Sequence, residues 1–132
     1  MNQMFSTTRA PKAIGPYSQA IRVSHPEAML FVSGQLGMCP ETGVMQDESI
    51  DTETVQALSN LRAIIEDAGF TLDDVVRTTV FLADMGDFAR VNDLYSRVFS
   101  AVLPARAAFS VKTLPRNARV EIDAFVVRSR KE

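Results

Sequence analysis

Apolar residues recur every three or four positions in two stretches of the chain, and this spacing gathers them on one face of a helix. The first stretch follows Asp51, a good helix N-cap, and ends before Gly69, a common helix terminator. The second follows Asp87, another candidate N-cap, and stops by Pro104. We therefore expect two amphipathic helices. Their apolar faces consist of Val55, Leu58, Leu61, Ile65 and Ala68 in the first and Phe88, Val91, Leu94 and Val98 in the second.

Five further stretches are rich in β-branched and other apolar residues without helical spacing, which is typical of strands. They are residues 17–23, 28–34, 75–83, 106–112 and 119–128. Turn residues at 24–27 predict a hairpin of the first two strands, and residues 115–118 supply a turn between the last two. Residues 1–16 are polar, and we expect them to be irregular.

The predicted order, β-β-α-β-α-β-β, indicates an α+β fold in one domain that spans residues 1–132. Two helices can cover only one face of the sheet, so the other face must be solvated or buried by another subunit. Phe81, Phe109 and Phe125 lie in predicted strands, and apolar side chains are available to both faces. Because large exposed apolar patches are uncommon on monomers, we expect a homo-oligomer formed through the sheet.

The composition is that of an ordinary soluble globular protein. Of 132 residues, 46% are hydrophobic and 23% are charged, and the formal net charge is -2. This charge argues against nucleic acid or an anionic membrane as a partner. The apolar runs are too short to span a bilayer, and the N-terminus lacks the apolar core of a secretory signal. Cys39 is the single cysteine, so no internal disulfide can form, and we expect a cytoplasmic protein.

Several kinds of chemistry lack the residues that they need. His25 is the only histidine and lies in a predicted turn, which argues against a conventional zinc site and a serine–histidine–aspartate triad. The sequence contains no dinucleotide-binding glycine motif and no P-loop. We expect neither a metal nor a cofactor.

Glu121 is the most informative acid. In RVEIDAFVV, strand alternation predicts two faces, which are Val120, Ile122, Ala124 and Val126 on one side and Glu121, Asp123, Phe125 and Val127 on the other. Glu121 is then either a solvated acid on an exposed face or a carboxylate in a cleft. In a cleft, desolvation would raise its pKa and suit it to activating water.

Arg106 is the second candidate, because it stands at the head of the predicted strand in LPARAAFSV. A guanidinium can hold a carboxylate through two parallel hydrogen bonds, a geometry that lysine cannot supply. The alternative is an ion pair with an aspartate or glutamate of the same chain.

Five other residues have both a structural and a binding interpretation. Tyr17 is either a half-buried aromatic residue or part of a cleft, and Asn92 is either on the polar side of its helix or near a ligand. Ser33, Gly34 and Gln35 end a predicted strand, where the glycine either makes a turn or lets a ligand approach the backbone.

Taken together, five motifs in this order resemble the RidA family of reactive-intermediate deaminases, also known as the YjgF family. The motifs are AIGPYSQA (13–20), VSGQLG (32–37), RTTVFLADMGDFARVNDLY (77–95), LPAR (103–106) and VEID (120–123). The resemblance covers residues 11–127, nearly the whole chain. Each motif alone is modest, whereas five in the correct order are highly specific.

The resemblance implies a fold similar to that of a bacterial chorismate mutase, in a homotrimer with sheets facing inward and ligand clefts between subunits. It also implies hydrolysis of 2-imino acids to 2-oxo acids and ammonia. Such substrates are 2-iminobutanoate, 2-iminopropanoate and the enamine 2-aminoacrylate, which pyridoxal-phosphate-dependent dehydratases release. No cofactor is implied.

By motif position, the resemblance implies that Arg106 holds the substrate carboxylate and that Glu121 orients or activates the attacking water. It places Tyr17 and Asn92 at the cleft, together with Ser33, Gly34 and Gln35.

Ala108 stands where many deaminase members have a cysteine. If the backbone N–H of that residue carries its role, alanine can replace cysteine. If the side chain shapes the cleft, turnover or substrate range will differ. A non-catalytic protein that binds small carboxylates is therefore the alternative function. Some family members carry an endoribonuclease L-PSP label, against which the acidic balance and the missing histidine pair argue.

Overall fold

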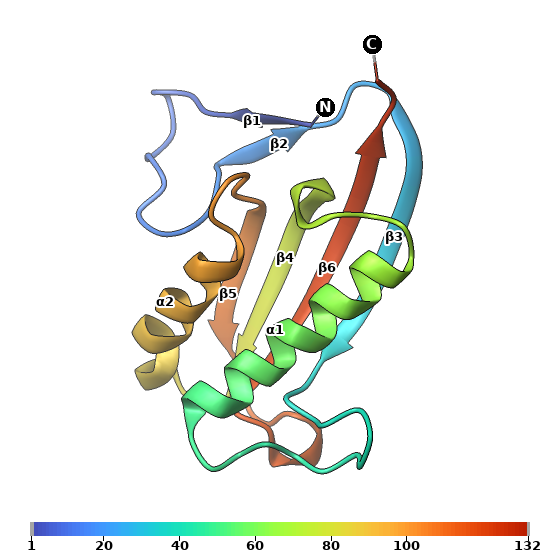
Figure 1. Ribbon diagram of the computed structural model, residues 1–132. Helices are drawn as coiled ribbons and strands as arrows, with labels where there is room; N and C mark the ends of the chain where they lie inside the picture. The colour runs from blue at the N-terminus through green and yellow to red at the C-terminus, as the bar shows by residue number, and fades with distance from the viewer. Residues whose placement is uncertain (1, 132) are drawn as a thin grey trace.

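A computed structural model of the chain describes residues 2–131 and contains a four-stranded sheet, two helices and a separate two-stranded sheet (Figure 1). The strands are β1 (Gln3–Phe5), β2 (Ala20–Arg22), β3 (Pro26–Gln35), β4 (Val75–Leu82), β5 (Ala105–Ser110) and β6 (Val120–Ser129). The helices are α1 (Ile50–Asp67) and α2 (Phe88–Val98). Three short 3₁₀ helices are η1 (Leu72–Asp74), η2 (Met85–Asp87) and η3 (Pro115–Asn117).

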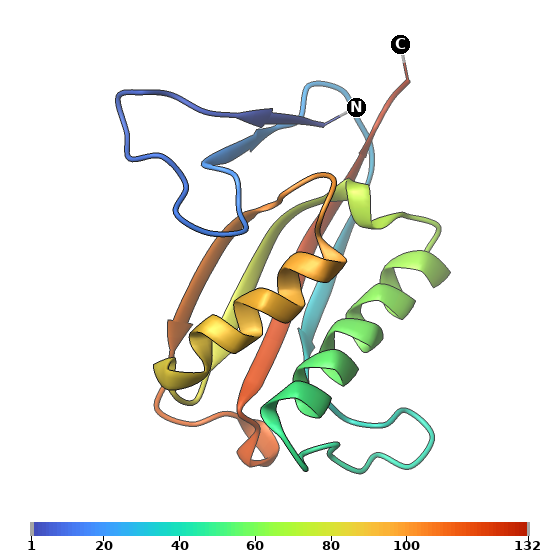
Figure 2. The same cartoon turned by 60° about the vertical axis from the view of Figure 1, so that its left-hand side comes forward.

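The large sheet has the order β3-β6-β4-β5 and is mixed, because β4 and β5 are parallel whereas β6 is antiparallel to both β3 and β4. Both helices lie on the same face of this sheet (Figures 1 and 2). The predicted α+β class and one-sided helical cover are therefore confirmed. Alternation along β6 is as predicted from Val120 to Val126, where four side chains are fully buried beneath the helices, whereas Val127, predicted for the other face, is buried as well. The four are Val120, Ile122, Ala124 and Val126.

The core between helices and sheet confirms most of the predicted apolar faces, with exceptions in α1. Val55 is 53% exposed and Ala68 is exposed, while Thr54 and Ala57 occupy buried positions of that helix. The predicted cap is also displaced, because Ser49 caps α1 in a capping box with Thr52.

Asp51 instead pairs with Arg90 of α2, at 2.6 Å, and so links the two helices. Asp87 does occupy the N-cap position of α2, although its side chain makes no capping hydrogen bond.

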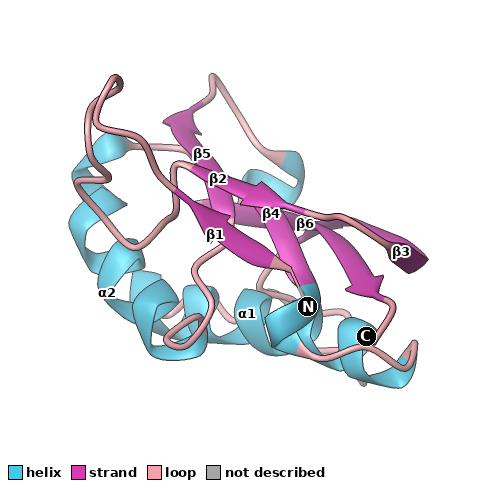
Figure 3. Ribbon diagram, turned by 90° about the horizontal axis from the view of Figure 1, so that it is seen from above, coloured by secondary structure: helices cyan, strands magenta, loops and turns pink. Residues whose placement is uncertain are grey.

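The predicted hairpin of 17–23 with 28–34 is wrong. Instead, β2 pairs with β1, which lies within residues 1–16, the segment expected to be irregular. These two strands form a separate small sheet across the end of the large sheet (Figure 3). The physical reason lies just before β2. Ser18 donates from its N–H to Pro104 O at 3.1 Å and from Oγ to Leu103 O, and it forms a bridge with Ala105. These bonds draw the segment toward β5 and away from β3.

The face of the sheet opposite the helices, here called the open face, carries exposed aromatic side chains. Phe31 is 65% exposed and Phe125 is 44% exposed, and their rings make an edge contact with centroids 5.4 Å apart. Phe81 and Phe109 form a second such pair at 5.5 Å. No helix within residues 2–131 is long and apolar enough to cross a membrane.

Candidate active site

Arg106 lies in β5 beside Thr78 of β4, with its side chain directed toward α2. Three aromatic rings surround the half-buried guanidinium, with centroids 5.0 Å (Tyr95), 5.6 Å (Tyr17) and 5.8 Å (Phe88) from its Cζ atom. Burial lowers the pKa of Arg106, although the group remains charged at any physiological pH. The rings hold the cation by cation–π attraction without neutralising it.

The guanidinium has one hydrogen-bond partner among residues 2–131. Its Nη1 donates to Asn92 Oδ1 of α2 at 2.7 Å, and no carboxylate of these residues forms an ion pair with it. Arg106 therefore does not form, within residues 2–131, the internal ion pair that was the alternative to ligand binding. A half-buried cation with free donors is suited to an anion that arrives from solution.

Tyr95 is a part of this site that the sequence did not single out. Its hydroxyl shares a buried hydrogen bond of 2.7 Å with Thr78 Oγ1, and burial raises the pKa of Tyr95 to about 12. The tyrosine therefore stays neutral, and its ring is fixed beneath the guanidinium. The one sequence signal that Tyr95 could pack in this site was its position four residues after Val91, on the apolar face of α2.

A cavity of about 250 Å³ opens at the guanidinium. Its lining comes from the segment before β2, from α2 and from β5. The residues are Ile14, Gly15, Tyr17, Phe88, Asn92, Arg106 and Ala108. The cavity combines a cation and an amide with apolar side chains, and its volume is below the usual range for drug-sized ligands. It therefore fits a small carboxylate with a short apolar chain.

Glu121 lies on the open face, opposite Phe81 of β4 in the strand register. Desolvation raises its pKa, and the charge of Asp123 raises it further. Gly34 on β3 is packed directly against it, since a Cβ atom there would overlap the Glu121 carboxylate. This close approach falls at an irregularity in the β3–β6 register between Val32 and Gln35.

The structure gathers the predicted site residues into two groups on opposite faces of the sheet. Arg106 and Ala108 share the helix-covered face, beside the buried Thr78 and Val80. Glu121 shares the open face with Phe125. The first group comprises Tyr17, Asn92, Arg106 and Ala108, and the second comprises Ser33, Gly34 and Glu121. One chain does not bring the two predicted catalytic residues together.

Gln35 belongs to neither group. Its side chain donates to Ser33 O at 3.2 Å, and it lines a separate cavity of about 480 Å³ between the end of β3 and α1. Cys39 also lines this cavity, and its thiol lies 3.0 Å from Glu41 Oε2. Within residues 2–131, no group of three His, Cys, Asp or Glu side chains is arranged to hold a metal ion.

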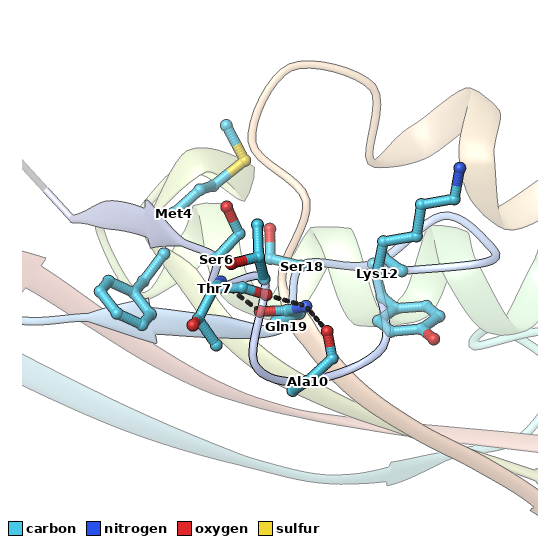
Figure 4. A pocket seen from close by; sticks show the side chains of 11 residues that line it. Met4, Ser6, Thr7, Ala10, Lys12, Ser18 and Gln19 are labelled. Atoms are coloured by element: carbon cyan, nitrogen blue, oxygen red, sulfur yellow. Dashed lines mark hydrogen bonds between the residues drawn. The ribbon is translucent and has the colours of Figure 1, made fainter.

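Tyr17 also lines a larger cavity of about 550 Å³. Figure 4 shows side chains that line this cavity, among them Thr7, Lys12 and Gln19. The cavity is enclosed by residues 4–19, and Lys12 is the one charged side chain among those that line it. Gln19 reaches across it to the backbone of Thr7 and Ala10. Because its polar backbone groups are bonded within the segment itself, we regard this cavity as the interior of the loop.

The molecule is thus a small α+β domain with an arginine cation on the helix-covered face of its sheet and a carboxylate on the open face. Residues 7–128 match the family described as Endoribonuclease L-PSP, and the chain belongs to this family. A curated relative from Mus musculus, named 2-iminobutanoate/2-iminopropanoate deaminase, is 47% identical over 97% of this chain and 93% of its own.

Two solved structures extend the comparison. A Thermotoga maritima protein shares 48% identity with a TM-score of 0.76, covering 98% of this chain and 100% of its own. TdcF of E. coli, solved with bound serine, shares 36% identity with a TM-score of 0.72 and covers 96% and 99% of the two chains. The fold and the family resemblance expected from the five motifs are therefore confirmed.

Proposed function

We propose that this protein is a hydrolytic deaminase of reactive 2-imino acids such as 2-iminobutanoate and 2-iminopropanoate, and of the enamine 2-aminoacrylate. The observation that carries the proposal is Arg106, a half-buried guanidinium that pairs with no carboxylate of residues 2–131 and faces a cavity of about 250 Å³. The name of the 47% identical mouse relative supports the same reaction. The serine bound to TdcF supports a small carboxylate as the ligand class.

In this reaction the substrate carboxylate binds the Arg106 donors that Asn92 leaves free. The protonated C=N carbon is then electrophilic without further activation. Water adds to that carbon and loses one proton, and the nitrogen gains a proton. The C–N bond then breaks while the carbon hydroxyl gives up its proton to the departing ammonia, which leaves a 2-oxo acid and ammonium. Positioning of the two reactants supplies most of the acceleration, and a general base adds about a hundredfold.

Glu121 is the proposed general base, and this role requires a second subunit. Its carboxylate lies on the open face, away from the Arg106 cavity of its own chain. Exposed Phe31 and Phe125 on that face are the kind of surface that a partner buries. We propose a homotrimer with sheets facing inward, in which Ser33, Gly34 and Glu121 of one subunit complete the Arg106 cavity of its neighbour.

The physiological setting that fits this chemistry is the cytoplasm, beside pyridoxal-phosphate-dependent dehydratases that release 2-imino acids. No metal or cofactor takes part in the proposed mechanism.

A non-catalytic carboxylate-binding role is the second candidate. The separation of Arg106 and Glu121 within one chain favours it, because Arg106 and its aromatic rings can bind an anion without help from Glu121. In that case, replacing Glu121 would leave binding of 2-oxobutanoate unchanged, and the protein would not accelerate imine hydrolysis.

The test is a coupled assay in which a threonine dehydratase generates 2-iminobutanoate and release of 2-oxobutanoate is followed. We expect the wild-type protein to accelerate release and Arg106→Ala to lose at least a hundredfold of that acceleration, since a buried charged anchor is removed. Ala108→Cys, measured alongside, reports whether the alanine limits turnover. Equal rates for wild type, Arg106→Ala and buffer would contradict the proposed reaction.

A further inference from the structure

Residues 7–16, here called the N-terminal arm, form part of the wall of the Arg106 cavity. Ile14 and Gly15 of the arm line the cavity, and an added Cβ atom on Gly15 would lie 3.5 Å from Arg106 Nη2. Ile14 is nevertheless 89% exposed, and residues 7–12 and Gly15 are exposed as well, while Ala13 and Pro16 are partly buried. Since the arm buries almost no apolar surface, something other than core packing must hold it in place.

The side chain of Gln19 supplies that restraint. Its Oε1 accepts from the N–H of Thr7 at 2.7 Å, and its Nε2 lies 3.2 Å from Thr7 O and 3.5 Å from Ala10 O (Figure 4). The same Nε2 donates to Pro11 O at 2.7 Å. One carboxamide thus binds the beginning and the middle of the arm at once. Glutamine has both the acceptor and the two donors that this arrangement needs.

Gln19 is itself fixed relative to Arg106. It follows Ser18, whose N–H and Oγ bond to the carbonyls of Pro104 and Leu103, immediately before β5. Tyr17 directly follows the arm, its hydroxyl accepts from the N–H of Ile14 at 3.3 Å, and its ring lies against the guanidinium of Arg106. A continuous set of bonds therefore connects Gln19, the arm and the cavity wall.

We propose that Gln19 is a positioning residue for the Arg106 cavity. Its carboxamide holds the N-terminal arm so that Ile14, Gly15 and Tyr17 form a wall beside the guanidinium, without touching the ligand itself. The inference rests on the proposed binding of a small carboxylate at Arg106. It adds that affinity depends on a side chain outside the cavity lining, through the order of the arm.

The test compares Gln19→Met, which has a similar length but no hydrogen bonds, with the matched control Gln3→Met. Gln3 is exposed on β1 and its side chain makes no hydrogen bond within residues 2–131. Arg9 and Lys12 place two trypsin sites in the arm. Tyr17 and Tyr95 are the only tyrosines, the chain has no tryptophan and Tyr95 is fully buried, so iodide quenching of tyrosine fluorescence reports on Tyr17.

For Gln19→Met we expect cleavage after Lys12 to be at least tenfold faster, with stronger iodide quenching. We also expect the affinity for 2-oxobutanoate to be about tenfold weaker, while the melting temperature stays within about 3 °C of wild type. Gln3→Met should match wild type in every measurement. Gln19→Glu, which keeps the acceptor and loses the donors, should change cleavage and affinity in the same direction and serves as the second variant.

Unchanged cleavage in both Gln19 variants would overturn the inference. So would fast cleavage with unchanged quenching and unchanged affinity, because the arm would then be irrelevant to the cavity. If the wild-type protein fails to bind 2-oxobutanoate, the proposed carboxylate site is wrong. Cleavage and quenching, which need no ligand, still decide whether Gln19 orders the arm and Tyr17.

Discussion

At the scale of single residues, Glu121 is held in a position that disfavours its own charge. Desolvation raises its pKa, and the neighbouring Asp123 adds repulsion. A raised pKa in the folded state means that the protonated form stabilises the fold. This contribution is fully present below the ordinary glutamate pKa of 4.5 and is lost as the pH rises through the folded value. At neutral pH the ionised carboxylate therefore works against folding, as general bases often do.

Glu121→Gln should accordingly separate stability from activity. We expect the variant to melt at a higher temperature than wild type at pH 8, with the difference disappearing below pH 4.5, and to lose at least tenfold in imine hydrolysis. Thermal melts across this pH range and the coupled assay supply the two measurements. Asp47→Asn, which alters an exposed acid without a side-chain hydrogen bond in residues 2–131, is the control. A Glu121→Gln protein no more stable than wild type at pH 8 would show that burial of this charge has no cost.

At the scale of elements, two glycines near the end of β3 each allow a close contact, one with a side chain of β6 and the other with the backbone of α1. A Cβ atom on Gly34 would overlap the side chain of Glu121, which can swing aside. A Cβ atom on Gly37 would overlap the backbone oxygen of Glu53, within α1, which cannot move so freely. Glu53 is moreover buried, and its carboxylate accepts from the N–H and Nε of Arg119 at 2.6 and 2.9 Å. The first glycine leaves room for the proposed general base, Glu121, whereas the second allows helix and loop to pack.

Gly34→Ala and Gly37→Ala should therefore have opposite effects. For Gly34→Ala we expect unfolding free energy within about 1 kcal/mol of wild type and a loss of tenfold or more in imine hydrolysis. For Gly37→Ala we expect a loss of roughly 2 kcal/mol in stability with activity retained per folded molecule. Urea titrations and the coupled assay measure the pair. Full activity in Gly34→Ala would mean that the placement of Glu121 does not matter.

The elements also show what sequence patterns could and could not predict. Alternation in β6 and the apolar spacing of α2 depend on local periodicity, and both were predicted correctly. The hairpin was wrong because the pairing of β2 depends on contacts of Ser18 with Leu103 and Pro104, about 85 residues away.

The same limit applies to the site. Arg106, Tyr17 and Asn92 belong to recognisable motifs and do converge on one cavity. The ring of Tyr95 and the carboxamide of Gln19 act through contacts that exist only once the chain is folded, so periodicity gave them no distinct signal. Sequence alternation did separate Glu121 from the buried face of β6, but it could not show that Arg106 projects from the opposite face.

At the scale of the whole molecule, the division of the predicted site residues between two faces of one sheet is the central feature. The helix face presents a cation that forms no ion pair within residues 2–131, and the open face presents a carboxylate among exposed phenylalanines. A second copy that packs on the open face can join the two groups without any change of fold. In a closed ring of three subunits, each interface would contain one Arg106 from one chain and one Glu121 from the next.

This arrangement predicts complementation between two inactive variants. Consider trimers assembled at random from equal amounts of Arg106→Ala and Glu121→Gln. An interface is intact when its arginine comes from a Glu121→Gln subunit and its glutamate comes from an Arg106→Ala subunit. Each condition holds for half of the subunits, so about a quarter of the sites should be active. Co-refolded mixtures should therefore recover about a quarter of wild-type imine hydrolysis. Mixing Arg106→Ala with the double variant should restore nothing, because no intact pair can form. If the first mixture also stays inactive while forming mixed oligomers, the two residues do not act across an interface.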